Sequence, residues 1–288
     1  MAVKTSQSQP LLAGVIGSPV AHSLSPVIHG EWARRERKAA YYIPMHVEDD
    51  DEAFNAAIHS LMKLGFSGVN ITLPHKERAI KCATRKSQAA EKIGAANMLT
   101  FIAGDIIADN SDAEGFKSSL LAELDKNADN KKVMVLGAGG SARAVLHGLS
   151  DIVGITSVFI TNRTKARAQE LASKFGVATV AWDDRASALE AFDIIINTTS
   201  LGMTGKPPLS LPIDTLKPRA VAMDIIYSPL ETAFLKSAKQ AGAKTVNGLE
   251  MLMHQAVPGY KSWLGDEAIV DDGLRQKLLS VLSQRDVT

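Results

Sequence analysis

The sequence predicts an α/β protein that is built from two domains. Its 288 residues are long for a single hydrophobic core, so two domains are the expected organisation. Short apolar runs alternate with helix-like segments along most of the chain, which is typical of a mainly parallel sheet with helices on both faces. A glycine-rich turn follows one of these runs near the middle of the chain, and the alternation restarts there.

In the N-terminal part, the sequence pattern predicts three strands, two helices and a hairpin. The first helix has Ser25 at its N-cap and Pro26 at its first helical position. A hairpin at 97–110 turns near Gly104 and Asp105. The strands are expected at 11–17, 41–47 and 69–73, and the helices at 25–37 and 49–64.

The second part restarts with an apolar strand and ends in helices. Its strands are expected at 133–137, 156–161, 178–182, 193–200 and 220–227. From Gly248 on, the pattern is helical. One economical arrangement is a first α/β domain, a second inserted α/β domain, and C-terminal helices that pack back on the first.

Composition excludes several classes of protein. The net charge is +1 with scattered basic residues, so neither a nucleic-acid nor a membrane surface is expected. Hydrophobic residues make up 45% and charged residues 22%, as in ordinary soluble proteins. The single cysteine, Cys82, fits a reducing compartment, and the first ten residues lack the apolar core of a signal peptide. We therefore expect a cytoplasmic enzyme or binding protein without a metal site.

The stretch "VMVLGAGGSARAVLHGL" carries a candidate dinucleotide site. Gly137, Gly139 and Ala142 have G-x-G-x-x-A spacing between an apolar strand and a helix. In a Rossmann unit the first glycine allows the tight turn, the second lets the backbone approach a pyrophosphate, and the small third residue allows close packing. The whole turn is the candidate site: Gly137, Ala138, Gly139, Gly140, Ser141 and Ala142.

The next strand indicates which dinucleotide binds. An NAD site usually has an acid here for the ribose 2′-hydroxyl. Instead "FITNRTKAR" offers Asn162, Arg163, Thr164 and Arg167, with no carboxylate among them. Guanidinium donors suit a phosphate dianion, so NADP is favoured over NAD.

Two ionisable residues are candidates for proton handling. Lys76 follows the predicted strand at 69–73, where ligands of α/β proteins usually lie, and Asp112 opens a helix. Asp112 is also a good helix N-cap by type and place. A nicotinamide enzyme that acts on an alcohol needs a group that takes the hydroxyl proton. Lys76 is either that base or a charged group that stabilises the alkoxide.

Ser23 and Ser25 form a second polar candidate. They are two residues apart, so in an extended segment both hydroxyls point the same way and can donate to a carboxylate. The alternative is that Ser25 caps the helix and Ser23 faces solvent. His22 and His29 are expected in a loop and on a helix surface, without a role.

These motifs resemble the shikimate dehydrogenase family over essentially the whole chain. The matching blocks occur in the expected order: "GSPVAHSLSPVIH", "GVNITLPHKE", "IGAANML" with "DNSDAEGF", "LGAGGSARAV" with "TNRTKAR", and "DIIYSPLETAFL" with "NGLEMLMHQA". The first two are specific to the family, whereas the glycine-rich block is not. The resemblance implies reversible, NADP-dependent oxidation of shikimate to 3-dehydroshikimate.

The resemblance also assigns roles to residues. Lys76 is implied as catalytic with Asp112 as its partner, and Ser23 and Ser25 as the contacts of the substrate carboxylate. The other implied substrate contacts are Asn70, Thr72, Asn97, Tyr227 and Gln255, and Ile225 and Gly248 join the cofactor site. The implied domains are a substrate domain at 1–111, an NADP domain at 112–248, and helices at 249–288 that complete the first. A monomer or homodimer is expected.

The chain departs from the family pattern at three positions. Gly30 replaces the usual Asn in a helix, and Ser111 replaces Thr but keeps the hydroxyl. Met98 replaces Thr and removes a hydroxyl near the site, which can shift preference among similar polyols. A quinate or dual quinate/shikimate dehydrogenase is therefore one alternative. A non-catalytic, NADP-dependent sensor is the other, although such a protein has no need of both Lys76 and Asp112.

Overall fold

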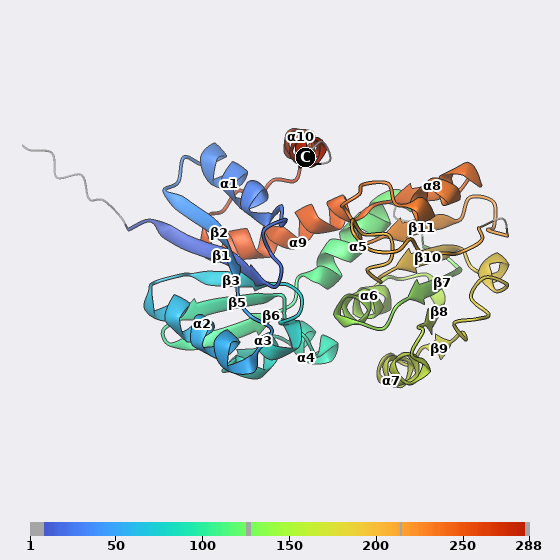
Figure 1. The fold of residues 1–288 in the computed structure, drawn as a ribbon, viewed down its shortest axis with the longest axis horizontal. Coiled ribbons are helices and arrows are strands. Elements are labelled where there is room, and N and C mark those ends of the chain that lie inside the picture. The colour runs from blue at the N-terminus through green and yellow to red at the C-terminus, as the bar shows by residue number, and fades with distance from the viewer. Residues whose placement is uncertain (1–8, 125–127, 214, 286–288) are drawn as a thin grey trace, which may run out of the picture. The chain divides into compact units, whose positions relative to one another are not determined.

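The computed structural model describes residues 9–124, 128–213 and 215–285 (Figure 1). The chain forms two compact units, Met1–Asn110 with Ala256–Thr288, and Ser111–Gln255. The sequence prediction put the corresponding boundaries after residues 111 and 248, and that domain assignment stays a prediction. The expectation about a signal peptide falls mostly on residues 1–8, which lie outside the described residues.

The first unit contains a six-stranded mixed sheet of order β2-β1-β3-β5-β6-β4. β1 pairs in parallel with β2 and β3, and β4 pairs in parallel with β6. The hairpin strand β5 runs antiparallel to β6, as the turn at Gly104 predicts, and also antiparallel to β3. The strands are β1 Leu11–Gly17, β2 Ala40–His46, β3 Gly68–Ile71, β4 Arg85–Lys86, β5 Met98–Ile102 and β6 Asp105–Asp109.

One face of this sheet is covered by α2, α3 and α4 (Figure 1). These helices span Asp51–Lys63, Lys76–Cys82 and Gln88–Ile93. Phe54, Ile58 and Leu61 form the apolar stripe of α2, spaced so that they share one side of the helix. They pack with Ile16 of β1 and other strand residues in one buried cluster. Alternate strand residues therefore point to the opposite face.

The other face is covered by α1 (Ser25–Arg35) and by the C-terminal helices. α9 spans Gly248–Trp263 and α10 spans Asp272–Arg285. The rings of Trp32 in α1 and Tyr260 in α9 pack edge to face with centroids 5.2 Å apart. Buried Glu31 of α1 forms ion pairs with Arg35 and with Lys277 of α10. These contacts confirm that the C-terminal helices return to the first domain.

The second unit contains a six-stranded, fully parallel sheet. Its order, β12-β11-β10-β7-β8-β9, is the order of a Rossmann fold with the switch point between β7 and β10. The strands are β7 Lys131–Leu136, β8 Ile155–Thr161, β9 Ala178–Thr179, β10 Ile194–Asn197, β11 Val221–Asp224 and β12 Lys244–Val246.

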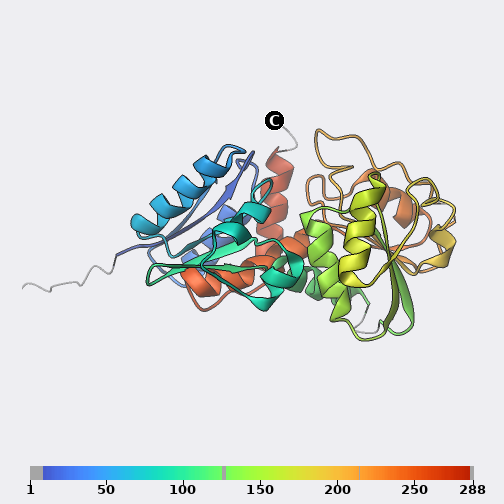
Figure 2. The same ribbon diagram turned by 90° about the horizontal axis from the view of Figure 1, so that it is seen from below.

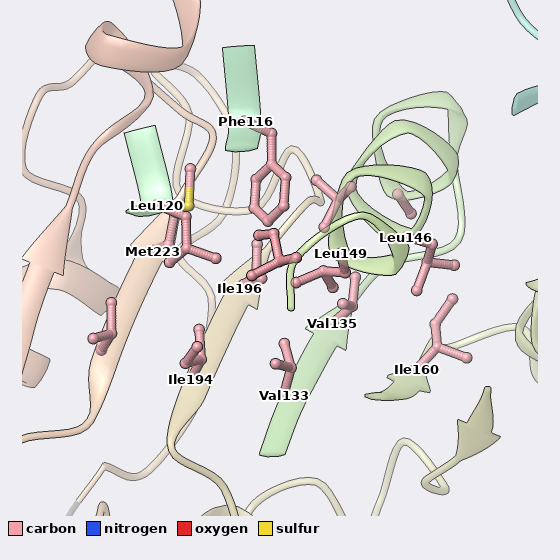
Figure 3. Packing of buried hydrophobic residues seen from close by; sticks show 14 of the residues in the cluster. Phe116, Leu120, Val133, Val135, Leu146, Leu149, Ile160, Ile194, Ile196 and Met223 are labelled. Atoms are coloured by element: carbon pink, nitrogen blue, oxygen red, sulfur yellow. The ribbon is translucent and has the colours of Figure 1, made fainter. Parts of the chain in front are cut away.

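Helices cover both faces of this second sheet. The helices are α5 Asp112–Glu123, α6 Gly140–Ser150, α7 Lys165–Phe175, α8 Ala233–Gln240 and the 3₁₀ turn η1 Leu189–Ala191. Phe116 and Leu120 of α5 and Leu149 of α6 pack on Val135 and Ile196 of the sheet (Figure 3). Residues of α8 and η1 pack on the opposite face. Figure 2 shows α6 and α7 together on one side.

Sequence reasoning missed two short strands and extended several others too far, β9 among them. β4 and β12 were not predicted, and β9 ends at Thr179 although a strand was expected up to residue 182. Each of the three lies at the edge of its sheet. Edge strands of two or three residues carry too little alternation to be recognised, because their position depends on the neighbouring strand.

Candidate active site

The glycine-rich turn connects β7 to α6 at the switch point of the parallel sheet. Gly137 has φ +109°, and a Cβ there would lie 2.7 Å from the Thr198 hydroxyl oxygen, so no other residue fits without strain. A Cβ at Gly139 or Gly140 would instead meet open space. Gly139 is the N-cap of α6 and no side chain caps this helix. Exposed backbone N–H groups beside an open surface fit a pyrophosphate group.

The remaining residues of the turn match this reading. Ala142 is fully buried against the sheet, where only a small side chain allows close packing of helix and strand. Ala138 and Ser141 are half-buried on either side of the two open glycines. The turn predicted from the sequence is therefore one continuous surface that can hold a dinucleotide.

The basic cluster lies beside this turn at the end of β8. Gly137 N donates to Thr161 O at 2.8 Å, which links the two neighbouring strand ends. Asn162 donates from Nδ2 to Thr164 O at 3.0 Å and thereby shapes the loop before α7. Arg163 and Arg167 are exposed, as a surface that receives a ligand phosphate requires. The donor set fits the 2′-phosphate of NADP.

Ile225 and Gly248 also lie together in the second unit. Gly248 N donates to Ile226 O at 2.9 Å, and a Cβ at Gly248 would lie 2.1 Å from Ile225 O. Ile225 N in turn donates to Asn197 O at 3.1 Å. Tyr227 follows two residues later and is half-buried. These residues occupy the carboxyl ends of β10, β11 and β12, the sheet edge that binds ligands in such folds.

Asp224, at the end of β11, is a buried acid that sequence reasoning missed. It accepts hydrogen bonds from Asn197 Nδ2 and Ile226 N, both at 3.1 Å, and from the Thr232 hydroxyl at 2.8 Å. Burial raises the pKa of Asp224 to about 6, although the Thr232, Ile226 and Asn197 donors act in the opposite direction. The network fixes the segment that carries Ile225 and Tyr227. In the sequence, the one sign of this network is a carboxylate at the end of an apolar run.

In the first unit, β3 leads into the turn that carries Lys76. His75 is fully buried, and its Nε2 lies 3.0 Å from Val47 O, which can only accept. Arg78 Nη1 lies 3.2 Å from His75 Nδ1, and because a guanidinium can only donate, Nδ1 is the acceptor of this contact. His75 is therefore structural, and it fixes the start of α3.

Lys76 is the first residue of α3, and its side chain is partly exposed. Its carbonyl oxygen accepts from Ala96 N at 2.9 Å. This bond joins the start of α3 to the loop that leads to Asn97. Lys76 and Asn97 are therefore held near each other through the backbone. Thr72 lies at the same end of β3, where its N–H donates to Ile16 O at 2.9 Å.

Asn70 and Asn97 form a buried polar pair on the α1/α9 side of the sheet. Asn70 Nδ2 donates to Asn97 O at 3.1 Å, and the same carbonyl accepts from Ile71 N at 2.8 Å. The hydroxyl of Tyr42 donates to Asn70 Oδ1 at 2.7 Å. Met98 is the direct cross-strand neighbour of Asn70 and is buried on that side. Sequence reasoning assigned no role to Tyr42.

The two serines are placed differently from the sequence prediction. Ser25 is the first residue of α1 and not its N-cap, which is Leu24. The segment before it is a turn, closed by Ser23 N donating to Val20 O at 3.0 Å, and not an extended strand. Ser25 N donates to Ser23 Oγ at 3.2 Å, so the turn satisfies a helix N–H group that has no carbonyl partner. The two serines still lie side by side.

Asp112 is likewise one position further into its helix than expected. The N-cap of α5 is Ser111, and Asp112 is the first helical residue and is buried. The Ser111 hydroxyl donates to Gln255 O at 2.8 Å, which brings Gln255 of α9 to the start of α5. The predicted substrate and catalytic residues are thus divided between the two units, with Lys76 in the first and Asp112, Tyr227 and Gln255 in the second.

His29 was expected on a helix surface, and that expectation is wrong. It is fully buried and stacks on Tyr42, with ring centroids 3.9 Å apart and planes at 10°. Burial lowers the pKa of His29 to about 3, so the ring is neutral. The sequence pattern failed here because α1 is covered by α9 and α10, which arrive from the far end of the chain.

Within residues 9–124, 128–213 and 215–285, no group of three or more His, Cys, Asp or Glu side chains is arranged to hold a metal ion. In the same part of the chain, no helix combines the length and the apolar character needed to span a bilayer.

Comparison with known proteins identifies the family. The model of the shikimate dehydrogenase substrate binding domain matches residues 15–99, and that of shikimate / quinate 5-dehydrogenase matches residues 119–203. A shikimate dehydrogenase (NADP(+)) of Cereibacter sphaeroides is 44% identical over 93% of this chain and 97% of its own length.

Two solved structures show the same likeness. Shikimate dehydrogenase from Aquifex aeolicus has a TM-score of 0.86 and 35% identity, covering 94% of this chain and 98% of its own. Shikimate 5-dehydrogenase from Thermus thermophilus, in complex with NADP(H) and shikimate, has a TM-score of 0.83 and 32% identity, covering 94% of this chain and 99% of its own. The chain therefore belongs to the shikimate dehydrogenase family.

Proposed function

We propose that this chain catalyses the reversible oxidation of shikimate to 3-dehydroshikimate with NADP. Family membership over nearly the whole chain supports the reaction, and the Cereibacter sphaeroides relative is named for NADP(+). The single observation that carries the cofactor choice is the end of β8, where Asn162, Arg163 and Thr164 stand without a carboxylate.

The second unit holds the cofactor in this proposal. Bound NADP supplies the hydride acceptor. The N–H groups of the turn from Gly137 to Ala142 bind the pyrophosphate, and Arg163 and Arg167 bind the 2′-phosphate with Asn162 and Thr164. Ile225 and Gly248 line the same edge of the sheet, where Gly248 N donates to Ile226 O.

The first unit supplies most of the substrate contacts. Ser23 and Ser25, adjacent in the turn before α1, donate to the substrate carboxylate. Asn70, Thr72 and Asn97 contact the ring hydroxyls. Tyr227 and Gln255 of the second unit complete the set. The neutral hydroxyl and amide groups orient a polyol without adding charge to the site.

Lys76 and Asp112 handle the proton of the reacting hydroxyl. Lys76 either accepts this proton as the base or stays charged and stabilises the developing alkoxide, and Asp112 is its partner in both cases. The position of Lys76 is fixed from two sides, through its carbonyl bond to Ala96 and through buried His75 before it. A catalytic group held by backbone bonds keeps its place with little cost in entropy.

The quinate dehydrogenase and sensor alternatives remain distinguishable by experiment. Quinate is included as a substrate because Met98, which lies beside Asn70, removes a hydroxyl that the family usually has near the site. We also propose that the protein acts in the cytoplasm, as a monomer or homodimer.

The test is the appearance of NADPH absorbance at alkaline pH, with shikimate and quinate each run against NADP and NAD. Fast turnover only with shikimate and NADP is expected. Comparable rates with quinate or NAD would move the protein to a dual-specificity branch. Measurable NADP binding without turnover on either acid would contradict the enzyme and favour the sensor.

A further inference from the structure

Tyr42 is the buried member of an otherwise exposed edge strand. Its neighbours in β2, Tyr41 and Ile43, have 60% and 44% of their surface exposed, whereas Tyr42 has 8%. Because alternate residues of a strand point to opposite faces, Tyr42 alone of these three points toward α1. Its position is therefore fixed by the interior of the first unit.

The Tyr42 hydroxyl lies within a directed chain of hydrogen bonds, and the Ser25 side chain is bonded to it as well. The Tyr42 hydroxyl donates to Asn70 Oδ1 at 2.7 Å, and Asn70 Nδ2 donates to Asn97 O at 3.1 Å. The backbone carbonyl of Asn97 can only accept, so the amide nitrogen of Asn70 must face it. The amide oxygen then faces Tyr42. The Asn97 carbonyl therefore assigns the orientation of the Asn70 amide, because a flip would lose that bond and would reverse the bond to the Tyr42 hydroxyl.

This arrangement limits what Asn70 can offer a ligand. One amide hydrogen is engaged by Asn97, and the second remains on Nδ2. The amide oxygen already accepts from Tyr42. Asn70 therefore meets a ligand as an N–H donor, and an N–H donor binds a hydroxyl oxygen and a ketone oxygen equally well because both accept.

His29 holds the Tyr42 ring in place. The two rings stack at 3.9 Å, and Trp32 meets His29 edge to face at 5.8 Å. Both ring nitrogens of His29 are buried without a hydrogen-bond partner in the part of the chain that the structure describes. A buried imidazole that makes no hydrogen bond contributes through packing. Its flat ring prevents Tyr42 from turning its hydroxyl away from Asn70.

We propose that Tyr42 is a positioning residue for the substrate: its hydroxyl orients the Asn70 amide so that Asn70 presents an N–H donor to a substrate oxygen. The proposal rests on the proposed function, because that function makes Asn70 a substrate contact. Burial raises the pKa of Tyr42 well above the usual range, so its hydroxyl keeps the donated proton at any working pH.

The test is the variant Tyr42→Phe, which keeps the ring on His29 and removes only the hydroxyl. The KM for shikimate is expected to rise about 3- to 10-fold, the effect of one neutral hydrogen bond. kcat and the KM for NADP stay near the wild-type values, because the lysine and the second unit are untouched. Tyr41→Phe is the matched control: it removes the same group from an exposed neighbour and leaves all three constants unchanged.

A double-mutant cycle with Asn70→Ala separates positioning from a general structural role. Tyr42→Phe should raise the KM much less in the Asn70→Ala background, because the amide that it orients is gone and only its contact with Ser25 remains. An unchanged KM in Tyr42→Phe overturns the proposal, and so does an equal rise in both backgrounds. If Asn70→Ala itself leaves the KM for shikimate unchanged, the substrate contact of the proposed function fails, and the positioning role with it.

Variants of His29 provide a second test of the positioning of Tyr42. His29→Phe keeps a flat ring against Tyr42 and should preserve the KM for shikimate, whereas His29→Ala frees the Tyr42 ring and should raise it. Melting temperatures identify a variant that fails to fold. A folded His29→Ala variant with wild-type KM would overturn the part assigned to His29.

Discussion

The two units of this protein hold their functional groups in different ways. In the first unit, the candidate substrate residues are tied to buried side chains: Tyr42 holds Asn70, and His75 holds the start of α3. In the second unit, the candidate cofactor residues lie on an open glycine turn and on exposed arginines.

The difference follows from what each unit is proposed to bind. A polyol is distinguished from its analogues by the direction of each donor and acceptor, so its partners must be fixed before binding. A phosphate is recognised by charge and by backbone N–H groups, which a turn and a helix start already provide. Mutations of the buried substrate contacts in the first unit should therefore act on catalysis and substrate, and those of the glycine turn and the exposed arginines in the second unit on the cofactor.

The largest effect is expected at Lys76. Lys76→Ala should lower kcat by about 10²- to 10⁴-fold, the usual contribution of a positioned proton-transfer group. The dissociation constant for NADP, measured by the fluorescence change on binding, should stay near wild type because the cofactor residues lie in the second unit.

The matched control for this variant is Lys81→Ala. Lys81 lies on the same helix, α3, but is exposed at its last turn. Its kcat should equal that of the wild type. A Lys76→Ala enzyme with near wild-type kcat would refute the catalytic role, whichever form of proton handling Lys76 performs.

A smaller and cofactor-specific effect is expected at Arg163. Arg163→Ala should weaken NADP binding by about 10- to 100-fold, the effect of losing a charge-assisted hydrogen bond to phosphate. NAD lacks this phosphate, so its weaker binding should hardly change. The KM values for both cofactors, measured at saturating shikimate, provide the comparison.

Lys165→Ala is the control for general loss of positive charge, because Lys165 is exposed beside Arg163 at the start of α7. It should affect NADP much less than Arg163→Ala does. Equal losses for NADP and NAD in Arg163→Ala would contradict the assignment of the 2′-phosphate.

The smallest effect on activity is expected at Asp224, where the change is instead in the stability of the second unit and its dependence on pH. Burial raises the pKa of Asp224 from 3.8 to about 6, so the folded state binds this proton more tightly than the unfolded state. The stability that this protonation provides is complete below pH ~4 and is lost as the pH rises through about 6. Asp224→Asn does not titrate and keeps the acceptor for Asn197 and Ile226. Its stability relative to wild type should increase by up to about 3 kcal/mol between these limits.

Asp193 provides a control with the opposite sign. Desolvation acts to raise its pKa, but donors from Lys132 N and Lys217 outweigh it and leave the pKa below 3.8. Its contribution is present above pH ~4 and is lost at lower pH. Asp193→Asn should therefore lose stability relative to wild type as the pH rises. Urea unfolding from about pH 2.5 to 8 measures both variants, because the Asp193 effect lies below pH ~4 and the Asp224 effect between about 4 and 6. Parallel slopes would contradict the role of burial at Asp224.

Much of the fold follows from local patterns in the sequence. The strand at Leu11–Gly17 agrees with its prediction at both ends, and the hairpin turns where Gly104 allows it. The stripe of Phe54, Ile58 and Leu61 marks the face that α2 buries. These elements are decided by the periodicity of neighbouring residues, and periodicity can be read from the chain alone.

Helix starts were less predictable than the helices themselves. Ser25 and Asp112 were each placed at an N-cap, and each is the first helical residue instead. A serine or aspartate near a helix start is compatible with either position, because both are favourable there. Ser23 decides the first case by accepting the N–H of Ser25, and Ser111 occupies the cap position in the second.

The sequence by itself determined the kinds of chemistry that this protein carries. Three contiguous motifs carry this chemistry. Their residue types indicate dinucleotide binding at the G-x-G-x-x-A turn, phosphate binding at the Asn162-Arg163-Thr164 cluster and proton transfer at the Lys76 turn. The tertiary structure alone decided which buried groups support them. Tyr42 contacts Asn70 across 28 positions of sequence, and Asp224 contacts Asn197 across 27. Such pairs leave no local pattern, because strand pairing and side-chain burial are fixed only when distant segments pack together.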